Sequence, residues 1–451
     1  MSASKDLLKK LQELVGESPA DQTEALLMTE DSSLTRFTPA AVHQHVAEQN
    51  QTLVLRVVLG KQVAAVTTNL LQPSSLRTAL EKAVSLARIL PPNPDFLSLP
   101  FPRPITEAKT FHENIRRLTP GKKVKAIRGA MGLAKRRGAS VSGAFSHGVV
   151  EVAVFNSLGV EAYQQYSDLS LHLIAQNDRG SGYAGFVSRD PDSLQVESLT
   201  QAAVSKISQR NAIEVPPGEY EVILEPDAVH EILAFGGYLG LHALAVQEGR
   251  SFLCRHFGEK LLDGKVTLYD DGLDPHGLQV PFDFEGVPKQ KVVFFDKGVA
   301  RNITYDSLTA GREKKESTGH APIPPSTEGP IPINLFMEGG DSSLAEMIHS
   351  VRKGIYVTRF HYTNVVEPMK AVITGMTRDG TFWVEDGEIK NPVKDLRFTE
   401  SILKALSRVK AISRERKICT SGSVYGHRFI TGTVAPAVQI EGFNFSGVSS
   451  L

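Results

Sequence analysis

The sequence predicts an α+β protein in which helices and strands gather in separate blocks. Residues 1–215 twice give strand candidates, a hairpin-like pair and an amphipathic helix. Residues 216–451 hold many short strand candidates separated by glycine turns, with one apolar helix among them. We therefore expect an N-terminal α+β region with a duplicated strand-hairpin-helix unit, followed by a mostly antiparallel β C-terminal domain that contains a buried helix.

The first unit, residues 1–90, is predicted to be an N-terminal α+β domain. Its first helix is indicated by leucines at three- and four-residue steps: Leu7, Leu8, Leu11 and Leu14. Residues 52–71 are rich in β-branched side chains and carry Gly60-Lys61 near their middle, which indicates a hairpin. An apolar stripe along residues 76–90 then predicts an amphipathic helix.

A proline-rich connector, residues 91–120, is predicted to separate this unit from the next. Residues 91–104 contain six prolines in fourteen positions, so the segment can neither continue a helix nor donate regular ladder hydrogen bonds. Residues 121–215 repeat the earlier order, with a basic helix, strand candidates and a closing amphipathic helix. We expect a middle α+β domain there.

Residues 216–451 are predicted to form the β-rich C-terminal domain. Its strand candidates lie at residues 265–272, 289–307, 370–389 and 437–447. The dipeptides Asp379-Gly380 and Asp386-Gly387 are typical of turns between such strands.

Two helices are predicted within this domain. The first runs from Pro226 to about Val246, and its apolar composition is typical of a buried helix. The second covers residues 401–413, near the end of the chain.

The composition predicts a soluble cytoplasmic protein. Lysine plus arginine equals aspartate plus glutamate at 50 each, so no net charge steers the chain toward nucleic acid or an anionic membrane. Cys254 and Cys419 are the only cysteines, fewer than a secreted protein of 451 residues usually carries. The N-terminal residues lack the apolar core of a signal peptide, and no run approaches the roughly eighteen apolar residues of a membrane span.

His230 and Glu231 stand next to each other in the apolar helix and match the start of a zinc-peptidase motif. In such a helix, histidine supplies a metal ligand, the following glutamate activates the bound water, and a second histidine one turn later completes the pair. The second histidine is missing here. Ala234 stands at its place in an HExxH pattern, and Phe235 stands at its place in HExxxH.

Two interpretations of this pair remain open from the residues alone. One is a metal site in which Cys419 is a third ligand and His242 or His427 substitutes for the missing histidine. The other is an amphipathic helix whose His230 and Glu231 face solvent or each other.

Gly180, Gly182 and Gly185 match the pattern GxGxxG after a strand candidate. A dinucleotide site also needs a helix directly after the glycines. Residues 186–191 are short, β-branched and end at a proline. We therefore interpret the glycines as a hairpin turn and expect no nucleotide cofactor.

Several long strings of this chain resemble the TldD/PmbA family of metallopeptidases. They are residues 156–165, 180–185, 246–253, 282–307, 356–368, 371–403 and 438–447. The resemblance implies an α+β N-terminal region, a β-rich C-terminal domain and proteolysis of unfolded or small peptides. It also implies a dimer, often of one TldD-type and one PmbA (TldE)-type subunit.

The resemblance also implies roles for single residues. TldD-type members carry HExxxH and a C-terminal cysteine. His230 matches the first zinc ligand, Glu231 matches the catalytic general base, and Cys419 lies near the expected cysteine. Phe235 stands at the second ligand, and its ring has no lone pair to donate. Because PmbA-type members generally lack the metal motif, this chain is more similar to that type, with an incomplete zinc site.

Three hypotheses about function result. The leading one is a PmbA/TldE-like subunit that holds peptide substrate and completes a metallopeptidase with a TldD-type partner, or as a homodimer. The second is a self-contained zinc peptidase that uses His230, Glu231 and Cys419. The third is an interaction module with no hydrolytic role.

Overall fold

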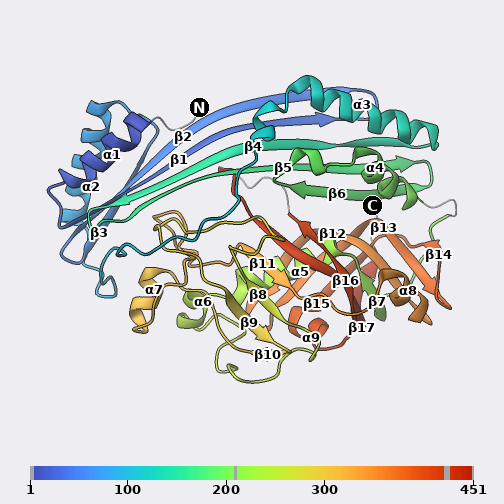
Figure 1. The fold of residues 1–451 in the computed structure, drawn as a ribbon. Coiled ribbons are helices and arrows are strands. Elements are labelled where there is room, and N and C mark those ends of the chain that lie inside the picture. Colours follow the sequence, from blue (N-terminus) through green and yellow to red (C-terminus); the bar gives the residue numbers. More distant parts are fainter. Residues whose placement is uncertain (1–4, 208–210, 421–426, 449–451) are drawn as a thin grey trace.

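A long six-stranded sheet lies over a β-rich C-terminal domain in the computed structural model (Figure 1), which describes residues 5–207, 211–420 and 427–448. The N-terminal region contains, in chain order, α1 (Lys5–Gly16), β1 (Gln22–Phe37), β2 (Val42–Leu59), β3 (Gln62–Thr68), α2 (Pro73–Ile89), η1 (Glu113–Arg117), α3 (Pro120–Arg136), β4 (Ser140–Asn156), β5 (Glu161–Asn177), β6 (Gly180–Ser188), η2 (Pro191–Ser193) and α4 (Val196–Ser205).

The six strands follow the order β3-β2-β1-β4-β5-β6, and all neighbours are antiparallel. Each half of this sheet comes from one run of helix, three strands and helix, which is the repeated order that the sequence predicts. Because β1 pairs with β4, both runs share a single sheet. The domain boundaries expected at residues 90, 120 and 215 stay a prediction.

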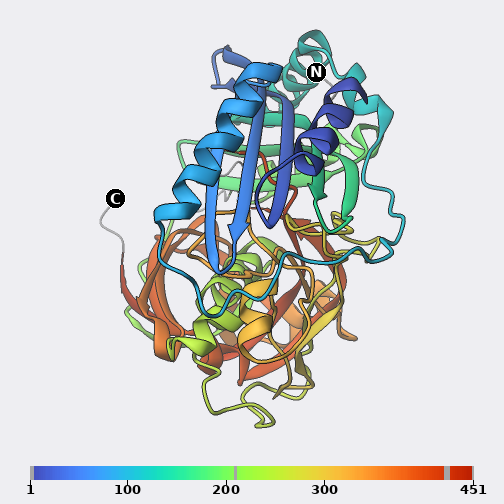
Figure 2. The ribbon, with the colours of Figure 1, turned by 90° about the vertical axis from the view of Figure 1, so that its left-hand side faces the viewer.

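Both faces of this sheet are covered, because successive side chains of a strand point to opposite faces. Ala25 and Leu27 of β1 pack in the cluster beneath α1 and α2, which lie on the outer face (Figure 2). Leu26 and Met28 point the other way and pack against loops of the C-terminal domain. Residues 25–28 of β1 therefore form a continuous apolar run. Helices α3 and α4 cover the second half of the outer face.

The C-terminal domain is built on a mixed, mostly antiparallel sheet of eleven strands. Its elements are β7 (Gly218–Leu224), α5 (Pro226–Gly240), α6 (Ala243–Gln247), β8 (Leu268–Asp270), β9 (Val292–Asp296), β10 (Val299–Ala300), α7 (Ser307–Arg312), β11 (Asn334–Met337), α8 (Leu344–Ser350), β12 (Lys353–Glu367), η3 (Pro368–Lys370), β13 (Val372–Glu385), β14 (Glu388–Pro392), β15 (Leu396–Ser401), α9 (Ile402–Leu406), β16 (Val409–Cys419) and β17 (Gly432–Val448).

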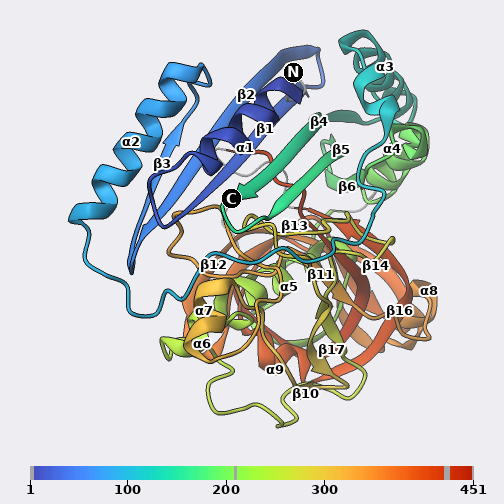
Figure 3. The same cartoon turned by 60° about the vertical axis from the view of Figure 1, so that its left-hand side comes forward.

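Helix α5 is the buried helix that the sequence predicts. Figure 3 shows it in the middle of the C-terminal domain, with strands around it. It contacts β12, β16 and β17, and Val229, Ile232 and Leu233 belong to the largest apolar cluster of the protein. The fold class predicted from the sequence is confirmed.

Two helix predictions were wrong in extent. The helix expected from Pro226 to about Val246 ends at Gly240, and His242 then caps the short α6 by accepting from the Ala245 backbone N–H. The helix expected over residues 401–413 reduces to α9, because Val409 and the residues after it join β16 and pair with β17. Tertiary pairing outweighs local helix propensity there.

One turn prediction was wrong, and a second was right in part. Asp379-Gly380 lies inside the continuous strand β13, where both residues have positive φ and the register with β12 shifts, so it forms a bulge rather than a turn. A hairpin turn at residues 178–179 joins β5 to β6, and the glycines of GxGxxG follow it within β6, where Gly180 pairs with Asn177. A Cβ at Gly182 would lie 2.2 Å from the Ala203 carbonyl oxygen of α4, so glycine is required by close packing.

The proline-rich connector crosses the surface of the C-terminal domain (Figure 2). The Arg312 side chain of α7 donates to Asp95 at 2.9 Å, and Arg103 donates to Glu316 at 3.1 Å. Across the described ranges, none of the helices combines the length and apolar character that spanning a bilayer requires.

Candidate functional site at the start of α5

The first turn of α5 carries a carboxylate that binds a lysine. Pro226 takes the first helical position, where its missing N–H is not needed, and Asp227 follows at the positive end of the helix dipole. Asp227 accepts a hydrogen bond from Lys417 Nζ of β16 at 2.5 Å. Although burial acts in the opposite direction, Asp227 raises the pKa of Lys417 to about 12. The pair is a fixed carboxylate–ammonium contact.

His230 lies one turn after Asp227 and faces the same pair. Its side chain is buried, with 7% of the residue exposed. Burial lowers the pKa of His230 to about 4, and the positive charges of Lys417 and His172 act in the same direction. The imidazole is therefore neutral at neutral pH, and a further cation beside it is disfavoured.

Cys419 lies two residues beyond Lys417 on β16, so both side chains point to the same face of the strand. It is 1% exposed, and burial together with the Asp227 carboxylate raises the pKa of the Cys419 thiol well above its ordinary value. Zinc binds the thiolate, whereas this environment favours the neutral thiol.

Glu231 points away from His230, because neighbouring positions on a helix lie about 100° apart. It is partly buried, and burial raises the pKa of Glu231 above its ordinary value. The Arg359 guanidinium and the Thr363 hydroxyl act in the opposite direction. Thr363 follows Tyr362, which has a φ of 57° and is 77% exposed at a register shift of β12. The glutamate thus lies beside a bulge.

The N-terminal sheet supplies the other wall of this site. His172 of β5 and Tyr183 of β6 share a hydrogen bond of 2.8 Å between Nδ1 and the phenol oxygen. The Arg359 guanidinium lies 4.5 Å above the centre of the Tyr183 ring. Asp379 accepts from Arg359 Nε at 2.9 Å and from Ser181 at 2.7 Å. The bulge of β13 therefore links both parts of the molecule at the start of α5.

Two predicted substitutes for the missing ligand lie elsewhere. His242 lies beyond the end of α5, and its Nε2 donates to the Tyr238 carbonyl at 3.2 Å. His427 contacts the Phe429 ring and lines a polar groove with Glu30. Neither joins His230 and Cys419, which both lie beside the Asp227–Lys417 pair.

The described residues do not fit a zinc ion as they stand. Structural and catalytic zinc sites use three or four nitrogen, sulfur or oxygen donors. Phe235, at the place of the second histidine, packs against the apolar cluster around α5. In the ranges that the structure describes, no three or more His, Cys, Asp or Glu side chains are grouped so that they could hold a metal. A lysine ammonium lies beside the two donors that are present.

Sequence reasoning missed Asp227, Lys417, His172 and Arg359 as members of this site. Asp227 had a local signal, because an acidic residue directly after a helix-starting proline is typical of a first turn. The others have none, since Lys417 lies 190 positions from Asp227 and is brought to it only by the sheet.

Comparison with known proteins identifies the family. Residues 217–447 match the family model described as the PmbA/TldA metallopeptidase C-terminal domain, which is about half of this chain. The chain belongs to the PmbA/TldD family. Its resemblance to that family, seen first in the sequence, is thereby confirmed.

Relatives in the PmbA/TldD family carry metalloprotease names. A metalloprotease of Methanothermobacter thermautotrophicus is 26% identical over 59% of this chain, and the match spans 60% of that protein's length. A metalloprotease PmbA homolog of Haemophilus influenzae is 25% identical over 80% of each chain. The crystal structure of TldE from Thermococcus kodakarensis superposes with a TM-score of 0.86 at 21% identity, covering 98% of this chain and all of that one. It shows that the two share a fold.

Proposed function

We propose that this chain is a PmbA/TldE-type subunit of a TldD/PmbA-type metallopeptidase that acts on unfolded or small peptides. In this proposal the zinc chemistry belongs to a TldD-type partner. The observation that carries it is the contact of 2.5 Å between Lys417 Nζ and Asp227 beside His230 and Cys419. Lys417 supplies the positive charge that a metal would supply in a catalytic subunit.

The side chains at the positions of the other zinc ligands support the same proposal. A zinc peptidase needs a second imidazole one turn after the first, and Phe235 offers no lone pair there. The raised pKa of Cys419, caused by burial and by Asp227, disfavours the thiolate that zinc requires. The Asp227 carboxylate beside the two donors, His230 and Cys419, is already bound by Lys417, so a metal would have to displace the ammonium.

The remaining residues of the site have a positioning role in this proposal. Glu225 directly precedes α5, and its side chain accepts from Lys206 Nζ at 2.8 Å and from the Tyr356 hydroxyl. Arg359 and Asp379 connect the same region to the N-terminal sheet. These contacts hold α5 rigidly between the two parts of the molecule, where a partner could use the site as a fixed surface.

Co-purification tests the proposal. The tagged chain, expressed with a TldD-type subunit from the same source, should retain that subunit and carry about one zinc per complex, held by the partner. Peptide hydrolysis should require both subunits. A chain that hydrolyses peptides alone, with about one zinc that is lost in His230→Ala, would instead establish the self-contained peptidase. A chain that binds no TldD-type subunit would also contradict the proposal.

A further inference from the structure

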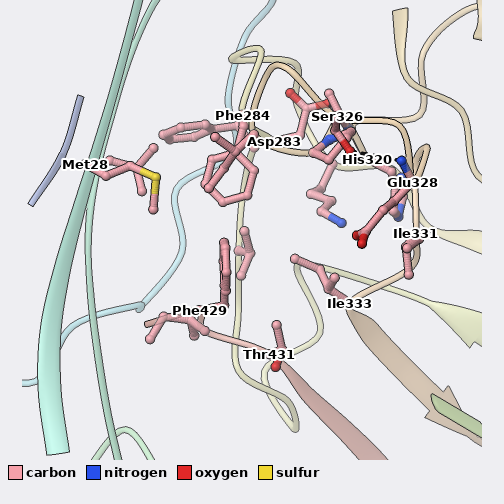
Figure 4. A pocket seen from close by; sticks show the side chains of 18 of the residues that line it. Met28, Asp283, Phe284, His320, Ser326, Glu328, Ile331, Ile333, Phe429 and Thr431 are labelled. Carbon is pink, nitrogen blue, oxygen red and sulfur yellow. Dashed lines mark hydrogen bonds between the residues drawn. The ribbon is translucent and has the colours of Figure 1, made fainter. Parts of the chain in front are cut away.

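A second candidate site lies between the inner face of the six-stranded sheet and the loops of the C-terminal domain (Figure 4). It is a pocket of about 540 Å³, within the range of about 300–1,000 Å³ that is usual for small-molecule sites. Met28 lies on the sheet side, and Phe284, Phe429 and Ile333 are on the loop side. Tyr238, the lining residue from α5, comes two turns after His230, so this pocket is separate from the α5 site.

Most polar groups of the pocket are already used by the protein. Asp283 accepts three backbone N–H groups at 2.8–2.9 Å. Arg428 donates two hydrogen bonds of 2.7 Å to Asp168. His320 Nε2 lies 2.9 Å from Asp270 and is fully buried. These three side chains are therefore held in place by the protein.

Among the described residues, two buried hydrogen-bond donors of the pocket are unused. Lys289 Nζ is buried and has no hydrogen bond to any described residue, and its nearest carboxylate oxygen, in Asp270, lies 3.7 Å away. Tyr166 is 3% exposed and lines the same pocket, and its hydroxyl has no hydrogen-bond partner in the described ranges. Burial and nearby Asp283 raise the pKa of Tyr166, so its hydroxyl stays a donor at neutral pH. Buried donors without acceptors are rare in folded proteins.

The carboxylate nearest to Lys289 leaves the hydrogen bonds of its ammonium unused. Burial and the neighbouring Glu285 carboxylate raise the pKa of Asp283 to about 8, so Asp283 is mostly uncharged at neutral pH. Asp270 lies 3.7 Å from Lys289 Nζ, and it already accepts from His320 and from the Asn334 backbone N–H at 2.7 Å. The Glu328 carboxylate also lines the pocket. Burial lowers the pKa of Lys289, and an anionic acceptor would counter that effect.

We propose that this pocket binds an apolar monocarboxylate whose carboxylate accepts hydrogen bonds from Lys289 and Tyr166. The apolar part would lie against the phenylalanine and aliphatic side chains of the wall. Hydrogen bonds to charged groups inside a low-dielectric pocket are stronger than those between neutral groups. The C-terminal residue of an apolar peptide and a medium-length fatty acid share this chemistry. The inference does not depend on the proposed function, because its donors lie outside the α5 site.

Calorimetric titration of the full chain tests the ligand class. The probes are decanoate and decanol, and an N-acetylated Leu-Phe dipeptide as its free acid and as its C-terminal amide. At least one acid should bind about tenfold or more tightly than its neutral counterpart, because its charge adds to the hydrogen bonds. The acid that binds identifies the source, lipid or peptide. Equal affinities within both pairs, or no binding by either acid, would overturn the proposal.

Variants of the two donors test the geometry. Tyr166→Phe removes one oxygen, and Lys289→Met removes the ammonium; each should weaken the acid about tenfold and leave the neutral probe unchanged. Tyr163→Phe is the matched control, because Tyr163 lies on the same strand and 42% of the residue is exposed. This variant should bind the acid as tightly as the wild type does. Unchanged acid affinity in Tyr166→Phe would overturn the assignment even if Lys289→Met does not fold.

Discussion

Two lysines mark two regions of this protein and differ in how their charges are used. Lys417 is one-third exposed, yet it lies 2.5 Å from Asp227 in the α5 site. Lys289 is 1% exposed, and no described residue accepts a hydrogen bond from its ammonium. The Lys417 ammonium is hydrogen-bonded to its counter-ion, whereas the carboxylate nearest to the Lys289 ammonium, in Asp270, lies 3.7 Å away. The second ammonium lies in a pocket large enough for a small molecule.

This contrast indicates where a ligand is to be expected. At the α5 site, where the family resemblance directs attention, the ammonium and its carboxylate are hydrogen-bonded to each other. In the pocket beneath the sheet, apolar walls surround two buried donors that have no hydrogen-bond acceptor among the described residues. A region without any sequence motif is therefore our candidate small-molecule site, whereas the cation of the motif-bearing region is already paired.

Acidification should destabilise the protein through the α5 site, and this is the largest effect that we expect. Burial lowers the pKa values of His230 and His172 from 6.5 to about 4. Between these values the unfolded chain binds more protons, so stability present above pH 6.5 is lost as the pH falls toward 4. Each histidine contributes a loss of about 3 kcal/mol over this window, at about 1.4 kcal/mol per pH unit. Urea unfolding between pH 7 and 4 should show that the free energy of unfolding declines less steeply for His172→Gln than for the wild type. Equal slopes would refute the lowered pKa of His172.

Removal of the paired lysine should have the next largest effect. Lys417→Met leaves the Asp227 carboxylate, only 12% exposed, without its counter-ion. Loss of one partner of a buried pair costs about 3–5 kcal/mol, and the exposure of Lys417 reduces our expectation to about 2 kcal/mol. Lys417→Arg keeps the charge and is the control. A melting temperature that is equal in Lys417→Met and the wild type would show that the pair contributes nothing.

Two tyrosines allow the loss of a hydrogen-bonded hydroxyl to be compared with the loss of one that has no partner among the described residues. The Tyr356 hydroxyl donates to Glu225, so Tyr356→Phe should lower the free energy of unfolding by about 1–2 kcal/mol. Tyr166→Phe removes a hydroxyl with no partner in the described ranges, so it should change the free energy of unfolding by less than about 0.5 kcal/mol. Denaturant unfolding measures both. A larger loss of unfolding free energy in Tyr166→Phe than in Tyr356→Phe would mean that the Tyr166 hydroxyl already makes a hydrogen bond within the protein.

The smallest effect is expected at Glu231. If the partner supplies the zinc-bound water and its general base, Glu231→Gln in this chain should leave the peptidase activity of the complex unchanged. The amide keeps the shape of the side chain, so loss of activity without loss of assembly would place Glu231 in the catalysis.

Much of the fold could be predicted from local pattern, and the site could be predicted only in part. Apolar periodicity is a local property, so the repeated order of helices and strands and the buried α5 were visible in the sequence. Asp379-Gly380 was misread because a bulge and a turn need the same positive φ. Residues 409–413 were misread because pairing with β17 outweighs their helical pattern.

The site shows the same division between local and distant information. His230 and Glu231 could be predicted because the metal-site motif places them at adjacent positions of the sequence. The roles of Lys417 and His172 depend on contacts between strands far apart in the chain, which no spacing rule reports. The pocket at Lys289 and Tyr166 had no signal at all, since its walls come from the N-terminal sheet, from α5 and from loops of the C-terminal domain.

Zinc binding shows whether Lys417 takes the place of a metal as the cation of the α5 site. Purified wild-type chain equilibrated with zinc should retain less than about 0.1 zinc per chain. The double variant Phe235→His/Lys417→Ala restores the second imidazole and removes the ammonium, so it should retain about one zinc. Phe235→His alone should bind weakly, because Lys417 remains. About one zinc in the wild-type chain, lost in His230→Ala, would contradict the claim.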